Sequence, residues 1–140
     1  MSAGPIVRFR RLSGERRRLL IRAAAVLTGA SAAVALLPFR RAIRFGSVPV
    51  AARNGVSAAD CVWAVAAAAR RLPLRTVCIE QGLAVQRMAR AAGLAAILHY
   101  GVRHDDETNK LEAHVWVTVE GQPIIGGDDA AHFALVASYP

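Results

Sequence analysis

Cysteine is scarce in this sequence. Its 140 residues include only Cys61 and Cys78, and their spacing fits neither a metal site nor a disulfide framework. Apolar residues make up 54% of the chain, which excludes a disordered protein. We therefore expect a folded protein in a reducing, cytoplasmic setting, with no metal and no cofactor.

Acidic residues are scarce in the first third of the chain. Residues 1–45 hold ten arginines and one acid, for a net charge of +9, whereas residues 46–140 hold eight basic and nine acidic side chains, for −1. Aromatic residues, on which single-strand-binding proteins stack bases, make up only 6%. We therefore divide the chain into a basic arm and helix over 1–45 and a main domain over 46–140, and we expect no nucleic-acid partner.

A helix is predicted from Ser13 to Leu37, because Ser13 can cap its start and Pro38 stops it. Its second half, from Ala23 on, is apolar but shorter than the ~20 residues that a bilayer span needs. Three arrangements stay open for this helix: packing on the domain, association with a membrane surface, and a span.

A second helix is predicted to begin at an S-x-x-D capping pattern formed by Ser57 and Asp60. It is rich in alanine and should run to about Arg71. Trp63, one turn inside, is expected to anchor the core.

A third helix carries Cys78. Pro73 ends what precedes it, and Thr76 is the expected N-cap, with Gly93 just past the other end. Cys78 would then lie about two residues inside the helix, where the dipole favours an anion and therefore a nucleophilic thiolate. A small buried core residue is the competing interpretation of this cysteine.

Helical spacing places Cys78 on the broad apolar face of that helix, pointing towards the protein body. Gln81 lies on the same face one turn away, where its amide would bond either the site or a loop backbone. Glu80, Arg87 and Arg90 fall on the opposite side.

After Gly93 the hydrophobic period changes from helix to strand. Strands are expected over 94–102, 112–119 and 122–125, with a polar loop over 103–110 and a turn at Glu120-Gly121. Helices followed by antiparallel strands indicate an α+β fold in which helices pack on a small antiparallel sheet.

A thiol nucleophile needs a base, and the base needs an orienting acceptor. Of the four histidines, His114 fits best, because it opens a well-patterned strand and shares a face with Trp116. The acceptor would be Asp128 or Asp129, and strand register alone favours Asp129 slightly. Both aspartates could instead be solvated turn residues.

Several motifs resemble one known family. They are Trp63-Ala64-Val65, Arg71-Leu72-Pro73, Cys78 with Gln81 to Ala84, and Ala113-His114-Val115-Trp116-Val117. Together they resemble the B protein of lasso-peptide biosynthesis, over roughly residues 57–127. That family is a group of transglutaminase-like, papain-related cysteine peptidases, and it removes the leader from a ribosomally made precursor.

The resemblance implies a transglutaminase/papain-like domain with Cys78 as nucleophile, His114 as base and Asp128 as the third residue. We take Gln81 and Trp116 as candidates for substrate binding. The chain has no room for a winged-helix recognition domain before residue 57, so the expected partners are the precursor, a separate leader-recognition protein and an ATP-dependent cyclase. Two alternatives stay open: a non-catalytic adaptor that docks precursor and cyclase, and an acyl transferase that uses the same thiol.

Overall fold

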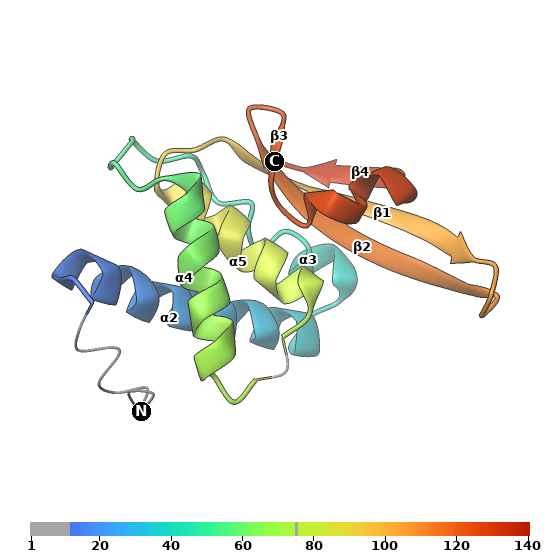
Figure 1. The fold of residues 1–140 in the computed structure, drawn as a ribbon, viewed down its shortest axis with the longest axis horizontal. Coiled ribbons are helices and arrows are strands. Elements are labelled where there is room, and N and C mark those ends of the chain that lie inside the picture. Colours follow the sequence, from blue (N-terminus) through green and yellow to red (C-terminus); the bar gives the residue numbers. More distant parts are fainter. Residues whose placement is uncertain (1–11, 75) are drawn as a thin grey trace, which may run out of the picture.

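The computed structural model describes residues 12–74 and 76–140 and has a helical layer beside an antiparallel sheet (Figure 1). The helices come first along the chain and the strands follow, which confirms the predicted α+β class. The elements are α2 (Gly14–Leu36), α3 (Phe39–Ala42), α4 (Ala58–Arg71), α5 (Cys78–Ala91), β1 (Ala96–Asp105), β2 (Lys110–Val119), β3 (Gln122–Ile125), the 3₁₀ helix η1 (Gly127–His132) and β4 (Ala134–Tyr139).

The start of α2 is as predicted. The Ser13 hydroxyl accepts the Arg16 backbone N–H at 3.3 Å, and the helix ends before Pro38. One side of α2 is buried in the same core cluster as α4 and α5, through Leu20, Ala23, Leu27 and Ala30. Of the described helices, α2 alone is long and apolar enough to cross a membrane (mean hydropathy 1.9), a property that core helices share.

The capping prediction for α4 is also confirmed. The Ser57 hydroxyl accepts the Asp60 N–H at 3.0 Å, while the Asp60 carboxylate accepts the Ser57 N–H at 3.1 Å. Two orphan donors are thereby satisfied at once. Trp63 is half-buried beside the core, and the Arg16 guanidinium lies 4.5 Å from its ring centroid.

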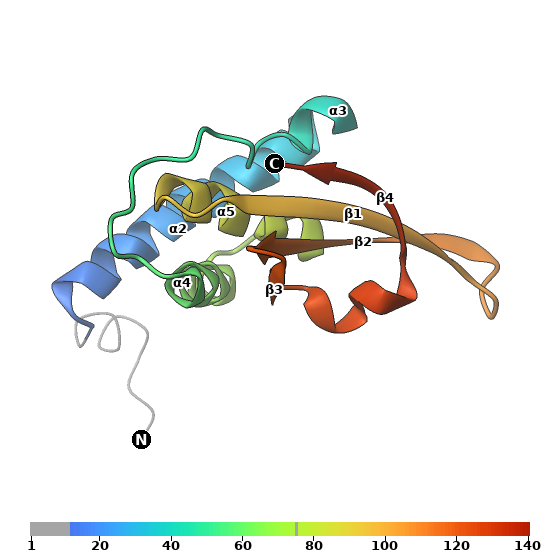
Figure 2. The same cartoon turned by 90° about the horizontal axis from the view of Figure 1, so that it is seen from above.

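The sheet has the strand order β3-β2-β1-β4, and its neighbouring strands are antiparallel. The Glu120-Gly121 turn is confirmed, because Val119 pairs directly with Gln122. A register shift between Val117 and Thr118 then breaks the simple pairing of β2 with β3. Figure 2 shows the β1–β2 hairpin extending away from the helices.

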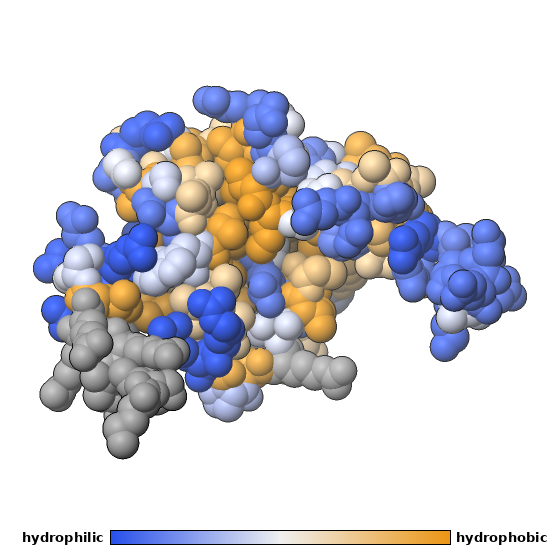
Figure 3. Space-filling view, in the orientation of Figure 1, coloured by the Kyte–Doolittle hydropathy of each residue, from blue (hydrophilic) through white to orange (hydrophobic). Residues whose placement is uncertain are grey.

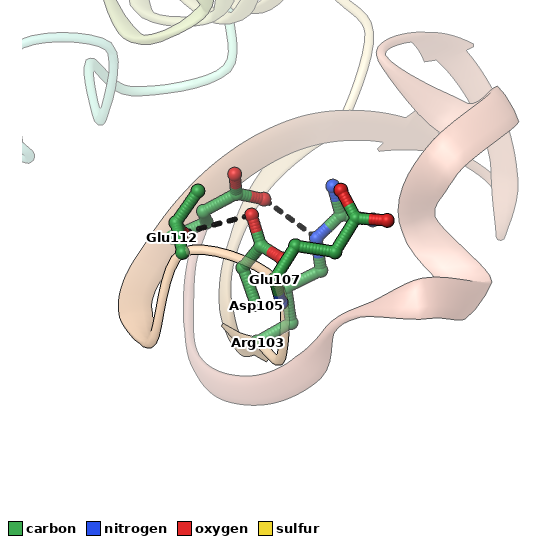
Figure 4. Close-up of polar contacts among 5 residues, drawn as sticks. Arg103, Asp105, Glu107 and Glu112 are labelled. Carbon is green, nitrogen blue, oxygen red and sulfur yellow. Dashed lines mark hydrogen bonds and ion pairs between the residues drawn. The ribbon is translucent and has the colours of Figure 1, made fainter.

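The polar loop predicted over 103–110 is shorter than predicted and covers only residues 106–109. Strands β1 and β2 run to Asp105 and from Lys110, and Arg103 faces Glu112 across the hairpin, with the Arg103 Nε 2.7 Å from a carboxylate oxygen (Figure 4). The Asp105 carboxylate accepts the Glu107 N–H at 2.9 Å and so closes the turn. The polar composition of this segment shows that it is exposed, but it does not exclude a strand. Opposite charges on cross-strand neighbours such as Arg103 and Glu112 stabilise an exposed strand pair.

Helix α5 packs on the inner face of the sheet at Gly82. A Cβ built there would lie 3.1 Å from Val115 Cγ2 and 3.4 Å from Leu98 Cδ1. The absence of a side chain therefore lets the helix approach β1 and β2 closely. Gln86, which is fully buried, donates from Nε2 to the Tyr139 carbonyl at 2.6 Å and ties α5 to the end of β4.

The surface differs between the two halves of the molecule. The hairpin tip is hydrophilic, whereas apolar surface gathers between α4 and β3 (Figure 3). A hollow of about 550 Å³ lies there, lined by Ala58, Ala59, Val62, Trp63 and Ile124.

Candidate active site

Cys78 is the first residue of α5, so it lies closer to the helix start than predicted. Thr76 is not the N-cap. Val77 takes that position, and the Glu80 carboxylate accepts the Val77 N–H at 3.1 Å. Glu80, predicted to lie on the outer side, is therefore buried, because its carboxylate folds back over the helix start.

The side chain of Cys78 is exposed, contrary to the prediction that it points towards the body of the protein. Leu74 and Val77 beside it are exposed as well. Helical periodicity identifies an apolar face, but it does not show whether another element covers each turn of that face. The described structure leaves Cys78, at the start of α5, open to solvent.

Cys61 differs sharply from Cys78. It lies inside α4 and is 1% exposed. Burial, together with a smaller contribution from the charge of Asp60, raises the pKa of the Cys61 thiol to about 11. Cys61 is therefore a protonated core residue, and Cys78 is the cysteine that a substrate can reach.

Gln81 bonds neither of the partners expected for it. Its Nε2 donates to the Thr76 hydroxyl at 3.4 Å, across the start of α5. Both residues line a hollow of about 410 Å³ between α4 and the α4–α5 connection, together with Ala66, Ala69, Arg70 and Leu74. This hollow lies next to Cys78 in the chain, which is a suitable place for a substrate side chain.

His114 lies on β2 and is half-buried. Its Nε2 is 2.7 Å from the Gly126 carbonyl oxygen. A carbonyl can only accept, so Nε2 carries the proton and Nδ1 is left as the acceptor in the neutral ring. The ring is thus held in the tautomer that a base acting through Nδ1 requires.

Gly126 fits this role because it has no side chain. Its φ is +74°, in the left-handed region, and a Cβ there would lie 2.6 Å from the Val115 carbonyl oxygen. The chain can therefore turn sharply at the end of β3 and present its carbonyl to His114.

Asp128 and Asp129 lie in η1 and are exposed. Strand β3 ends at Ile125, so neither aspartate sits opposite His114 in a ladder, and the register argument does not reach them. Among the described residues no hydrogen bond joins either carboxylate to His114, and the orienting bond comes from the Gly126 backbone instead. A catalytic role for either aspartate stays a prediction.

Trp116 shares a face with His114, as predicted, and lies between two histidines. The centroid of the Trp116 ring lies 6.1 Å from that of His114 and 5.5 Å from that of His99. His99, which the sequence analysis passed over, contacts the hydroxyls of Ser138 and Thr118 through its two ring nitrogens, each at 2.8 Å. Burial lowers the pKa of His99 below its usual value. The pairing of β1 with β4 brings His99 opposite Ser138, and this long-range pairing has no local signal in the sequence.

The described structure does not join the predicted nucleophile, Cys78, to the predicted base, His114. Val115 faces α5, and successive side chains of a strand point to opposite faces, so His114 lies on the other face of β2. Within residues 12–74 and 76–140 no hydrogen bond connects Cys78 to His114. The described residues also contain no group of three potential metal ligands.

The sequence model of the Transglutaminase-like superfamily matches residues 6–138, nearly the whole chain. The match confirms the transglutaminase-like fold class. No curated protein and no solved structure matches the chain significantly.

Proposed function

Because this chain belongs to the transglutaminase-like superfamily, whose members are generally cysteine-dependent enzymes, we propose that it is a cysteine peptidase. Its substrate would be the ribosomally made precursor of a lasso peptide, from which it removes the leader. The single observation that carries the proposal is the exposed thiol of Cys78 at the first residue of α5. Further support comes from the combination of Cys78 with the segment Ala113-His114-Val115-Trp116, which resembles the B proteins of lasso-peptide biosynthesis.

In the proposed reaction the Cys78 sulfur attacks the carbonyl of the last leader residue. The thiol proton passes to His114 Nδ1 and then to the leaving amine, so the core peptide departs with a free N-terminus. Water next hydrolyses the thioester and releases the leader. The backbone N–H of Cys78, at a helix start, is a natural donor to the oxyanion.

Catalysis requires His114 Nδ1 to approach the Cys78 sulfur. The Gly126 carbonyl already holds Nε2 and therefore takes the orienting role. Asp128 or Asp129 would act from the following 3₁₀ turn, where a negative charge favours the imidazolium that forms. Because His114 lies on the face of β2 that points away from α5, this approach would require β2 or the start of α5 to rearrange when the precursor binds.

Substrate and partners follow from the same proposal. Gln81 would contact the precursor from the hollow beside Cys78, and Trp116 would do so from the sheet face that carries His114. A separate recognition protein would present the leader, and an ATP-dependent cyclase would receive the core peptide. Since both cysteines are free thiols, we place the reaction in the cytoplasm.

One observation favours a second candidate, a non-catalytic adaptor that docks precursor and cyclase. Cys78 and His114 share no hydrogen bond among the described residues, and an adaptor would need none. Acyl transfer is the chemical variant of the peptidase, because an amine can replace water at the thioester.

The deciding experiment is incubation of the protein with precursor and recognition protein, followed by mass spectrometry. Release of both the leader and a core peptide with a free N-terminus supports the peptidase. Transfer of the leader to an added amine would indicate an acyl transferase. An unchanged precursor, in an assay where a catalytically competent homologous system cleaves it, would contradict both and favour the adaptor.

A further inference from the structure

Two large apolar side chains are exposed on the outer side of α2, one near each end, with Thr28 and Ala32 exposed between them, although the inner side of α2 belongs to the core. Ile21 is 60% exposed and Leu36 is 81% exposed. Leu37 and Phe39, the first residue of α3, are exposed as well, although the Phe39 ring also contacts Tyr100, with the ring centroids 5.3 Å apart. Between Arg22 and Arg40 the sequence contains no charged residue. We call the surface formed by Ile21, Leu36, Leu37 and Phe39 the α2–α3 face.

Exposed arginines stand at both ends of the α2–α3 face. Arg17, Arg18 and Arg22 precede it, and Arg40, Arg41 and Arg44 follow it. No acidic residue occurs between Glu15 and Asp60. From Arg22 to Leu36 a helix rises about 20 Å, so the two groups of arginines are well separated along one surface.

We propose that the α2–α3 face lies flat on an anionic membrane surface. The apolar side chains enter the boundary between headgroups and acyl chains, and the arginines bind lipid phosphates. Long arginine side chains can reach the headgroups while their stems cover apolar surface. The proposal does not depend on the proposed peptidase activity.

The packing of α2 decides between a surface contact and a span. Leu20, Ala23 and Leu27 are buried against the rest of the domain. A spanning α2 would have to leave the core and expose the apolar surface of α4 and α5 that it covers. Figure 2 shows α3 following directly on the C-terminal end of α2, so Leu36 and Leu37 lie next to the arginines of α3.

Charge favours lipid over a protein partner. A membrane leaflet offers diffuse negative charge along the whole face, and both groups of arginines can use it without a matched geometry. A protein would need acidic clusters at two places about 20 Å apart, on either side of an apolar ridge.

The test is co-sedimentation of the full-length protein with vesicles of phosphatidylcholine alone and of phosphatidylcholine mixed with phosphatidylglycerol. We expect strong binding to the mixed vesicles, weak binding to phosphatidylcholine, and loss of binding at high salt. Leu36→Glu should weaken binding to the mixed vesicles about tenfold, because it places a charge in the apolar boundary.

Leu111→Glu is the matched control, since it makes the same change at an exposed leucine of the hairpin tip. Replacing Arg40 and Arg41 by Gln should weaken binding by about tenfold or more, whereas replacing Arg53 and Arg70, which are also exposed, should change it little. Circular dichroism checks that each variant is folded.

Three results would overturn the proposal. They are absence of wild-type binding to the mixed vesicles, equal binding to both vesicle types, and equal binding by Leu36→Glu and Leu111→Glu. A concentration-dependent dimer that Leu36→Glu abolishes, in a protein that ignores vesicles, would assign the face to a second copy of the chain instead.

Discussion

Helices α4 and α5 have the same length of 14 residues, and each carries one cysteine, yet the two cysteines differ in every respect that matters for chemistry. Cys61 is the fourth residue of α4, beyond a closed capping box, and is buried against the core. Cys78 is the first residue of α5 and is exposed. Position within the helix and coverage by other elements, rather than residue type, decide which thiol a substrate can reach.

The largest expected effect follows from replacing each thiol. Cys78→Ala should abolish leader release, since loss of the nucleophile from a catalytic unit lowers kcat by a factor on the order of 10⁶. Cys61→Ala should keep the rate and lose only about 1 kcal/mol of stability through the smaller side chain. Rates of leader release are measured by mass spectrometry for both variants, and melting curves check that both are folded. Equal activity of the two variants would contradict the different roles assigned to Cys61 and Cys78.

Thiol labelling tests the same contrast without any substrate. At pH 8 a thiol whose pKa is about 11 is ionised in only about one molecule in a thousand, so iodoacetamide should modify Cys78 and spare Cys61. Trypsin separates the two sites into peptides 76–87 and 54–70. Labelling of Cys61 in the folded protein at a comparable rate would show that α4 is less closed than described.

The raised pKa of Cys61 also fixes the sign of a pH effect. The folded chain holds this proton above pH 9, the ordinary value, where the unfolded chain releases it. Stability should therefore fall as pH rises from 9 towards 11, and Cys61→Ala should reduce this fall. Urea unfolding across that range would measure it, and an unchanged slope in the variant would argue against Cys61 as the source.

The hydrogen bonds that the Asp60 and Glu80 carboxylates make at the starts of α4 and α5 should contribute similarly to stability. Asp60→Ala and Glu80→Ala each remove a carboxylate that accepts a backbone N–H at 3.1 Å, and each should cost about 1 kcal/mol in the free energy of unfolding. Urea denaturation measures both. If Glu80→Ala cost nothing, the carboxylate would not be holding the start of α5, and the position of Cys78 would need another explanation.

The smallest expected effect concerns the two aspartates. Because the Gly126 carbonyl already orients His114, Asp128→Asn and Asp129→Asn should each lower kcat by less than about threefold. A loss of several hundredfold in one of them would instead identify the acid predicted from sequence and show that His114 changes its partner during catalysis.

Local signals were predictable, and long-range coverage was not. The caps at Ser13 and at Ser57 with Asp60 involve residues three apart, and the Glu120-Gly121 turn pairs its own neighbours, so each could be read directly from the sequence. The cap of α5 was missed because Val77, at the N-cap, has no hydroxyl. Only the Glu80 carboxylate makes a capping hydrogen bond there, so the usual Ser or Thr signal is lacking. Glu80 therefore looked like an outward residue.

The candidate site was predicted only in part for the same reason. A helix that begins near Cys78 follows from the stop at Pro73, and the face shared by His114 and Trp116 follows from strand alternation. The exposure of Cys78 depends on there being no covering element in the described part of the chain, and the bond of His114 to Gly126 depends on a left-handed turn after β3. Neither has a signature within a few residues, because both depend on segments far apart in the chain.

The most direct test of the central claim, that Cys78 is the nucleophile, is detection of the acyl-enzyme. The protein is mixed with precursor and recognition protein and quenched in acid within the first turnover. Its mass is then measured intact, and the modified segment is identified by fragmentation or by digestion at low pH. The account predicts a mass increase equal to the leader acyl group on the segment 76–87, absent in Cys78→Ala. Leader release without an adduct on that segment, and undiminished in Cys78→Ala, would contradict it.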